Sequence, residues 1–453
     1  MIRKRSAATA LALTLLAVSV PAYGNPAADT DIAGRVAEHL DATGTPGAAL
    51  AVTTAGATTY THAWGVDGDE RPVTPDTPFL WGSVAKPVTA TVALSLGVDP
   101  AAPVGRYLPE FTPTWRGEPA EVTVGQLMSH TSGITSMAAT DAGDNGPGAV
   151  SRVAARLYDY ELDTAPGEAH VYTSSNYLLL GAVIEAVTGR EFAEVLTETV
   201  LTPAGMTHAV TGPDDPLPPG HAQYFGRPFS FDDPFDRSGL PYGYLGGSIT
   251  DLAAYARFAL TGPAVMTEPQ PGTDGRYGLG WSLGRLPGTD EPMVWHSGAT
   301  RGYQAVLILL PAKGIAVALL QNTYGEARAE QLLNAGFDAA LMSAGYRPGS
   351  TYGPNALLHL PWAASLAALT VLAWAAWRAF RPRVRRRWLA LIWAAVALVP
   401  LALPASAGAD WRTMWFWTPD AAWTLAACTV AAVLAALVEA LRPAAATRAA
   451  RRS

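Results

Sequence analysis

The residues best placed to do chemistry are Ser83 and Lys86, three positions apart in Ser-Val-Ala-Lys. At this spacing two side chains lie on one face of a helix, so the amine can reach the hydroxyl group. A neutral lysine can take the serine proton and turn the oxygen into a nucleophile. The chain has three Lys against 28 Arg, and an arginine could not do this work because it keeps its proton. The pair predicts acyl-serine chemistry, although surface helices also produce this spacing by chance.

The sequence around Ser83 and Lys86 makes the predicted class of protein more specific. Residues 79–90 resemble the nucleophile region of the serine β-lactamase and penicillin-binding-protein superfamily, most closely the branch of class C β-lactamases, D-alanyl-D-alanine carboxypeptidases and related esterases. Five further blocks resemble that family's motifs in the family's order, and they are residues 123–134, 166–181, 246–253, 277–281 and 296–298. Ordered blocks are far more specific than any one short motif. The resemblance covers about residues 29–345.

The resemblance implies a fold and three catalytic roles. The fold would be α+β, with an antiparallel sheet flanked by helices, a helical subdomain, and a catalytic groove between the two. Ser83 would be the nucleophile and Lys86 its proton acceptor or hydrogen-bond partner. Tyr172 aligns with the family's catalytic tyrosine and would move a proton between serine, lysine and leaving group. The simpler alternatives are a helix-capping serine, a surface lysine and a packing tyrosine.

Two positions depart from the family's substrate-binding pattern. Ser174 stands where the family's Tyr-x-Asn motif has its amide, and Asn176 could replace that amide only if the loop shifts. Serine has fewer hydrogen-bonding groups and less reach than an amide. His296 stands where penicillin-recognising relatives usually have a lysine, and histidine is only partly charged at neutral pH. We therefore expect weak carboxylate binding and poor β-lactamase activity, with Arg301 as the alternative carboxylate ligand or His296 as a structural residue.

The remaining substrate-binding residues follow His296 directly. Ser297 would line the groove, and Gly298 would let the substrate backbone approach the strand. By analogy with the family, the backbone N–H groups of Ala299 and Ser83 would form the oxyanion hole.

Two other patterns in the sequence offer alternative catalytic residues. His130 follows a predicted helix and precedes Thr131 and Ser132, which favours a structural role over a serine–histidine–acid triad. Residues 280–284 fit the G-x-S-x-G pattern of an α/β-hydrolase. That reading needs a helix at Ser282 and an acid and a histidine on later strands, but Asp290 and His296 follow too closely.

The hydrophobic pattern places strands at both ends of the body. Residues 29–42 have helical spacing, and residues 48–53 and 58–63 read as strands. Near the other end, residues 304–310 and 315–321 read as strands and 327–343 as a helix. Residues 83–260 look mostly helical. This distribution predicts an α+β domain whose sheet joins the two chain ends.

Composition excludes several classes of protein. Residues 25–377 carry a formal net charge of −18, which argues against nucleic-acid binding. The single cysteine, Cys428, allows no internal disulfide, and no Cys/His cluster has metal-ligand spacing. We therefore expect no metal and no other cofactor. Residues 1–24 have the basic start, apolar run and small-residue end of a secretory signal. We accordingly expect an extracytoplasmic catalytic domain.

Three apolar runs follow the body, at residues 357–377, 388–403 and 421–441. The arginines gather between the first and second runs and after the third, whereas the segment between the second and third is rich in tryptophan. The positive-inside rule then predicts a body outside, an arginine-rich loop inside, a tryptophan-rich loop outside and a basic tail inside. We predict a signal peptide (1–24), a hydrolase domain (25–347), a linker (348–356) and a three-helix multi-pass membrane domain (357–453) in the cell membrane.

The sequence thus predicts an exported, membrane-anchored serine hydrolase that cleaves a D-alanyl peptide or a small ester. Two alternatives stay open. One is a β-lactamase. The other is a non-catalytic sensor that binds penicillin or peptide and signals through the membrane helices. The expected partners are a small-molecule or peptide substrate and the lipid bilayer.

Overall fold

A six-stranded antiparallel sheet forms the centre of the body, with the strand order β2-β1-β12-β11-β10-β9. The computed structural model describes residues 31–137, 139–349, 359–380, 387–406 and 411–441. The expected signal segment and basic tail, and nearly all of the expected linker, lie outside them. The sheet strands are β1 (Gly47–Thr54), β2 (Thr58–Gly65), β9 (Ser282–Arg285), β10 (Pro292–Ala299), β11 (Gln304–Leu310) and β12 (Ile315–Gln321).

The sheet forms because its central strands are apolar on both faces. Along β1, Leu50 and Val52 pack in a cluster on one face, while Ala49 and Ala51 pack in the larger cluster on the other. Alternate residues of a strand point to opposite faces, so a continuous apolar run is buried on both sides. Strands β11 and β12 show the same division. Strand β1, from one end of the body, pairs with β12, from the other end, inside the sheet.

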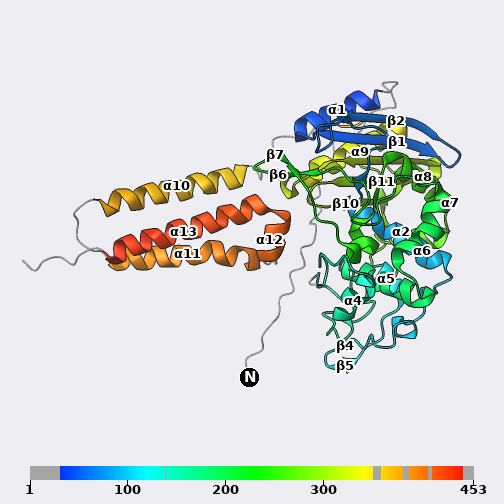
Figure 1. The fold of residues 1–453 in the computed structure, drawn as a ribbon, viewed down its shortest axis with the longest axis horizontal. Coiled ribbons are helices and arrows are strands. Elements are labelled where there is room, and N and C mark those ends of the chain that lie inside the picture. Colours follow the sequence, from blue (N-terminus) through cyan, green and yellow to red (C-terminus); the bar gives the residue numbers. More distant parts are fainter. Residues whose placement is uncertain (1–30, 138, 350–358, 381–386, 407–410, 442–453) are drawn as a thin grey trace, which may run out of the picture.

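Helices cover both faces of the sheet (Figure 1). α1 (Ile32–Thr43) and α9 (Ala329–Ser343) supply the residues that pack with Leu50. On the other face lie α2 (Ala85–Ser95), preceded by the 3-10 turn η1 (Gly82–Val84), and α8 (Ile249–Leu260). The helical part beyond them contains α3 (Val124–Met128), α4 (Ala149–Ala154), α5 (Ser175–Thr188), α6 (Phe192–Leu196), α7 (Thr202–Ala204) and the π-helical turn η6 (Leu240–Tyr244).

Short strands complete the body. They form a sheet of β13 (Thr323–Tyr324), β6 (Gly220–Tyr224) and β7 (Arg227–Phe231), and two pairs, β3 (Phe79–Leu80) with β8 (Gly246–Gly247) and β4 (Thr114–Trp115) with β5 (Glu118–Pro119). The pairing of β3 with β8 ends directly before η1 and α8. The β3–β8 pair therefore places η1, and with it the start of α2, next to the start of α8.

The α+β prediction is confirmed, including the strands 304–310 and 315–321 with their exact bounds. The G-x-S-x-G reading of residues 280–284 is wrong. Ser282 begins the edge strand β9, not a helix, and β9 pairs with β10. A nucleophile elbow needs a sharp turn from strand to helix, which this segment lacks.

Three helices long and apolar enough to cross a membrane follow the body among the described residues. They are α10 (Leu360–Ala379), α11 (Arg387–Ser406) and α13 (Pro419–Leu441), with the short helix α12 (Trp411–Trp417) between the last two. Figure 1 shows them extending from one side of the body, with α12 at the end nearest to it. The three expected apolar runs are thus helices of spanning length, and the tryptophan-rich segment is also helical.

Candidate active site

Ser83 and Lys86 meet as their spacing predicts. Lys86 Nζ lies 2.8 Å from Ser83 Oγ and donates a hydrogen bond to it. Ser83 sits in the middle of η1, and Lys86 is the second residue of α2, so one continuous helical turn carries both. Pro87 falls within the first turn of α2, where its missing N–H leaves no hydrogen bond unmade. Ser83 is half-buried, which leaves its hydroxyl group reachable by a substrate.

Lys86 is fully buried, and its amine has three acceptors. Besides Ser83 Oγ, Nζ donates to Ser174 Oγ at 3.1 Å and to the Tyr242 carbonyl at 2.9 Å. Burial in a poorly solvated site lowers the lysine pKa to about 7, and the nearby Asp141 carboxylate opposes this shift. A large fraction of Lys86 is therefore neutral near pH 7. In that form its lone pair can accept the proton of Ser83.

Ser174 takes the place of the family's amide by accepting a hydrogen bond from Lys86, not by facing a substrate amide. It lies directly before α5 and is buried. Asn176 does not replace it. The Asn176 amide is buried between Ser132, which donates to its oxygen at 2.7 Å, and His130 Nδ1 at 3.3 Å. The side chain of Asn176 therefore braces the loop after α3.

Tyr172 reaches Ser83 from the segment before α5. The two hydroxyl groups are hydrogen-bonded, and Lys86 Nζ lies 5.0 Å from the centroid of the tyrosine ring. Part of the ring is open to solvent (39 % exposed), but the surroundings of its hydroxyl group raise the pKa by desolvation. Tyr172 is therefore a neutral phenol. Lys86 is the stronger candidate for the base, and Tyr172 is suited to relaying a proton.

The end of β10 packs tightly against η1. A β-carbon on Gly298 would lie 1.9 Å from the carbonyl oxygen of Trp81 and 2.5 Å from the backbone nitrogen of Ser83. The backbone nitrogen of Ala299 lies 2.3 Å from the β-carbon position of Gly82, whose φ is +53°. Only glycine fits such an approach. The amides of Ser83 and Ala299 thus lie close together, as the expected oxyanion hole requires.

His296 is buried and has both ring nitrogens engaged. Nδ1 lies 2.6 Å from the Ser297 carbonyl, which can only accept, so Nδ1 carries the proton and Nε2 accepts from the Tyr277 hydroxyl at 3.0 Å. Burial, with a smaller effect of the nearby Lys86 charge, lowers the His296 pKa to about 3. The side chain is therefore neutral. This arrangement is that of a structural histidine, with no positive charge for a substrate carboxylate.

The other predicted binding residues lie at the same end of β10. Ser297 pairs with Val306 of β11 and is half-buried. Arg301 lies in the turn that follows, where Asp233 already holds its guanidinium through Nε at 3.0 Å and Nη2 at 2.9 Å. A substrate carboxylate would have to compete with this ion pair.

His130 stands at the centre of a cluster of aromatic rings behind Tyr172, whose ring centroid is 4.3 Å away. Its Nδ1 accepts a hydrogen bond at 3.3 Å from the backbone N–H of Thr173, which directly follows Tyr172. Burial lowers its pKa well below the usual value. The loop position has φ +58°, uncommon for a residue with a side chain. The geometry is that of a residue that holds Tyr172 in place.

Sequence reasoning missed two contributors to the site. The Tyr242 carbonyl binds Lys86 from η6, a π-helical turn, and such turns are common at functional sites. Asp141 acts on Lys86 through space, and its backbone N–H donates to the Tyr242 hydroxyl at 2.8 Å. A carbonyl contact depends on backbone position alone, so no residue pattern could have pointed to it.

The comparisons with known proteins agree with this geometry. The family described as Beta-lactamase matches residues 32–340. Penicillin-binding protein 4 of Amycolatopsis lactamdurans is 31 % identical over 312 residues, 61 % of this chain and 81 % of that protein. A D-aminopeptidase of Gluconobacter oxydans is 30 % identical over 339 residues, 69 % of this chain and 62 % of the relative. The chain thus spans less than two thirds of the length of some curated relatives it matches.

One solved structure is also similar to this chain. SurE, solved with D-Leu, is 26 % identical, has a TM-score of 0.55, and covers 72 % of this chain and 78 % of its own. The motif order, the fold and the serine–lysine–tyrosine geometry lead to one conclusion. The chain belongs to the beta-lactamase family, the family of serine hydrolases that includes penicillin-binding proteins and D-aminopeptidases.

Proposed function

We propose that this protein is an exported, membrane-anchored serine hydrolase that cleaves amide or ester bonds through an acyl-Ser83 intermediate. The observation that carries the proposal is the 2.8 Å contact between Ser83 Oγ and Lys86 Nζ, with a lysine whose pKa is about 7. Neither a surface lysine nor a helix-capping serine needs such an arrangement. Burying an amine costs stability unless its hydrogen bonds are made inside the protein, and Lys86 makes three of them within the site.

The reaction follows from the positions of the groups. Neutral Lys86 takes the Ser83 proton as Oγ attacks the substrate carbonyl carbon. The N–H groups of Ser83 and Ala299 stabilise the oxyanion. Its collapse breaks the bond to the leaving group, which receives the proton from Lys86 through Tyr172. A water molecule then attacks the acyl-serine ester by the same steps in reverse, releasing the acid and restoring Ser83.

The substrate class is the finer part of the proposal. We favour D-alanyl peptides or small esters, in keeping with the relatives named as a penicillin-binding protein and a D-aminopeptidase and with the D-Leu in the SurE structure. Within this class, neutral His296 and the ion-paired Arg301 favour small esters, and D-alanyl peptides in which no free carboxylate stands beside the scissile bond. They disfavour efficient β-lactam hydrolysis, since β-lactams carry that carboxylate.

A sensor remains the second candidate. Contacts between α12 and the body give a physical route from the site to the membrane helices. A sensor of this kind would be acylated at Ser83 but would not turn over. A body outside the membrane and an arginine-rich loop inside are the expected topology for either function.

The test compares the full-length protein in detergent with its Ser83→Ala variant on a p-nitrophenyl ester. Ser95→Ala is the matched control, because Ser95 is an exposed serine on the same helix. We expect wild type and Ser95→Ala to show a burst followed by turnover, and Ser83→Ala to show neither. A burst without turnover would favour the sensor. Equal rates in wild type and Ser83→Ala would contradict the acyl-serine mechanism.

A further inference from the structure

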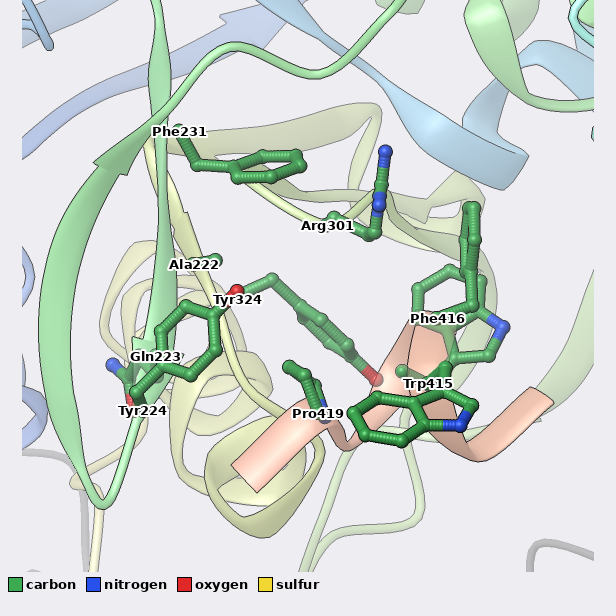
Figure 2. A pocket seen from close by; sticks show the side chains of 10 residues that line it. Ala222, Gln223, Tyr224, Phe231, Arg301, Tyr324, Trp415, Phe416 and Pro419 are labelled. Carbon is green, nitrogen blue, oxygen red and sulfur yellow. The ribbon is translucent and has the colours of Figure 1, made fainter. Parts of the chain in front are cut away.

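The short helix α12 packs against the body near the catalytic residues. It lies between the second and third candidate membrane spans and has the sequence Trp-Arg-Thr-Met-Trp-Phe-Trp. Figure 2 shows Trp415 and Phe416 of α12 lining a pocket together with Phe231, Arg301 and Tyr324 of the body. The membrane domain and the hydrolase domain therefore share a set of contacts. Two of them involve residues that are linked to the catalytic candidates, Asp141 and Arg301.

The first contact leads to the catalytic lysine. Arg412 Nη2 donates to the backbone carbonyls of Thr140 at 2.9 Å and Asp141 at 3.2 Å. The Asp141 backbone N–H donates to the Tyr242 hydroxyl at 2.8 Å, and the Tyr242 carbonyl accepts from Lys86 Nζ. Hydrogen bonds from a charged donor are stronger than neutral ones. Arg412 is thus linked to Lys86 through two residues of the body.

The second contact joins Phe416 of α12 to Arg301, close to the predicted oxyanion-hole residue Ala299. The guanidinium carbon of Arg301 lies 4.5 Å from the ring centroid of Phe231 and 4.6 Å from that of Phe416. A cation held between two aromatic faces is attracted to both. Arg301 follows Ala299 by two residues. Phe416 of the membrane domain therefore helps to hold the turn after β10. The last residue of β10, Ala299, is a predicted oxyanion-hole donor.

Further contacts anchor α12 and its neighbours. The rings of Trp417 and Tyr324 pack edge to face, with centroids 5.6 Å apart. The Phe225 backbone N–H donates to Asp420 Oδ2 at 2.9 Å, just inside α13. Trp362 of α10 donates from Nε1 to the Phe225 carbonyl at 3.3 Å. Each membrane segment next to the body is thus tied to the strands β6, β7 and β13 or to the turns beside them.

The charges around Asp141 show why a cation is needed there. Asp141 is half-buried, at φ +53°, and desolvation raises its pKa, as do the carboxylates of Asp236 and Asp233. The groups that favour its charged form are the Tyr244 hydroxyl, which donates at 3.2 Å, and Arg412. Without Arg412, Asp141 would keep its uncommon backbone conformation. Its carboxylate would also lose the positive charge that offsets the carboxylates of Asp236 and Asp233.

We propose that α12 supports the active site from outside and that Arg412 is a positioning residue, which holds Thr140 and Asp141 so that Tyr242 keeps Lys86 against Ser83. This proposal rests on the proposed function, because its kinetic effect is an effect on acylation of Ser83. It makes the membrane domain a part of the catalytic unit. The hydrolase would then reach full activity only while α12 is docked.

The experiment uses full-length protein in detergent and the variants Arg412→Gln, Arg412→Lys and Arg285→Gln. The last is a control at an exposed arginine on β9. The rate of the acylation burst, kcat, KM and the melting temperature are measured for each. We expect Arg412→Gln to slow acylation about tenfold, which is 1.36 kcal/mol. We also expect an unchanged substrate concentration at half the maximal burst rate, an unchanged melting temperature, partial recovery in Arg412→Lys, and wild-type rates in Arg285→Gln.

Amide hydrogen exchange supplies a readout independent of activity. The Asp141 amide, which donates to Tyr242, should exchange faster in Arg412→Gln than in wild type. A wild-type acylation rate in Arg412→Gln, or unchanged exchange at residues 139–141, would overturn the positioning role. So would losses of rate that match a general loss of melting temperature. If wild type itself shows no acylation, the proposed function fails, and the exchange comparison still tests the docking of α12.

Discussion

The amine of Lys86 lies 2.9 Å from the backbone carbonyl of Tyr242, a contact that helps to fix the lysine in place. Tyr242 belongs to η6, more than 150 residues further along the chain. The same turn binds α2 a second time, because the Thr89 hydroxyl donates to the Pro241 carbonyl at 2.7 Å. The start of the nucleophile helix is therefore held by η6 at two residues, and Lys86 has little freedom to leave Ser83.

The first prediction concerns the pH dependence of kcat/KM. The reaction needs neutral Lys86, and burial lowers its pKa to about 7. Activity should therefore rise with pH through about 7 and level off above it, because the amine loses its proton in that window. Initial rates on an uncharged ester between pH 5.5 and 9 test this. Lys86→Arg should lose about a thousandfold or more, since a guanidinium keeps its proton. A profile that is flat through pH 7 would contradict a lysine base.

The second prediction concerns Asp141→Asn. The Asp141 carboxylate opposes the downward shift of the Lys86 pKa, so removing its charge should lower that pKa further. The acid limb of the pH profile should then move to lower pH. Asp144→Asn is the matched control, because Asp144 lies on the same segment but is paired with Arg152. A shift toward higher pH, or an equal shift in both variants, would count against the assigned interaction.

The third prediction concerns Tyr172→Phe. The variant keeps the ring that packs on His130 but loses the hydroxyl group bonded to Ser83. Acylation should slow by about 10²- to 10⁴-fold, the usual contribution of a positioned proton-transfer group. The melting temperature should hardly change. Tyr60→Phe, at a partly buried position on β2, serves as control. Near-normal acylation in Tyr172→Phe would assign the tyrosine to packing alone.

The fourth prediction concerns the close approach of β10 and η1. Gly298→Ala would put a β-carbon 1.9 Å from the Trp81 carbonyl oxygen, so β10 must move away from Ser83. We expect a lower melting temperature and a loss of about 10²- to 10³-fold in kcat, as when an oxyanion-hole donor is displaced. Gly56→Ala is the control, because its β-carbon would meet nothing within 4 Å. Equal kcat in the two variants would argue against the oxyanion role of this strand end.

The fifth prediction concerns membrane topology. Alkaline phosphatase fused after residue 410 should be active, because the segment between the second and third spans is expected outside. A fusion after residue 384 should be inactive, because that arginine-rich loop is expected inside. Both fusions must be present in equal amounts for the comparison to hold. The reverse pattern of activity would contradict the proposed orientation.

Local pattern alone was enough to predict much of the fold. The strands β11 and β12 are uninterrupted apolar runs bounded by turn residues, and their bounds were predicted exactly. The three apolar C-terminal helices were also predicted, because length and composition decide whether a helix can span a membrane. The proximity of Ser83 and Lys86 followed from helical spacing, which is set within four residues.

Only the tertiary structure decided the protonation states and the hydrogen-bond partners of the site residues. Whether His296 is charged depends on burial and on the nearby Lys86 charge, and neither is visible in a short motif. Arg301 was predicted as a carboxylate ligand from its position alone, but a distant carboxylate, Asp233, occupies it. The link from Arg412 to Lys86 joins residues that lie far apart in the chain. The sequence by itself determined which groups can react, because reactivity is a property of residue type and local spacing. Folding decided their protonation and partners, because those depend on desolvation and on contacts between distant segments.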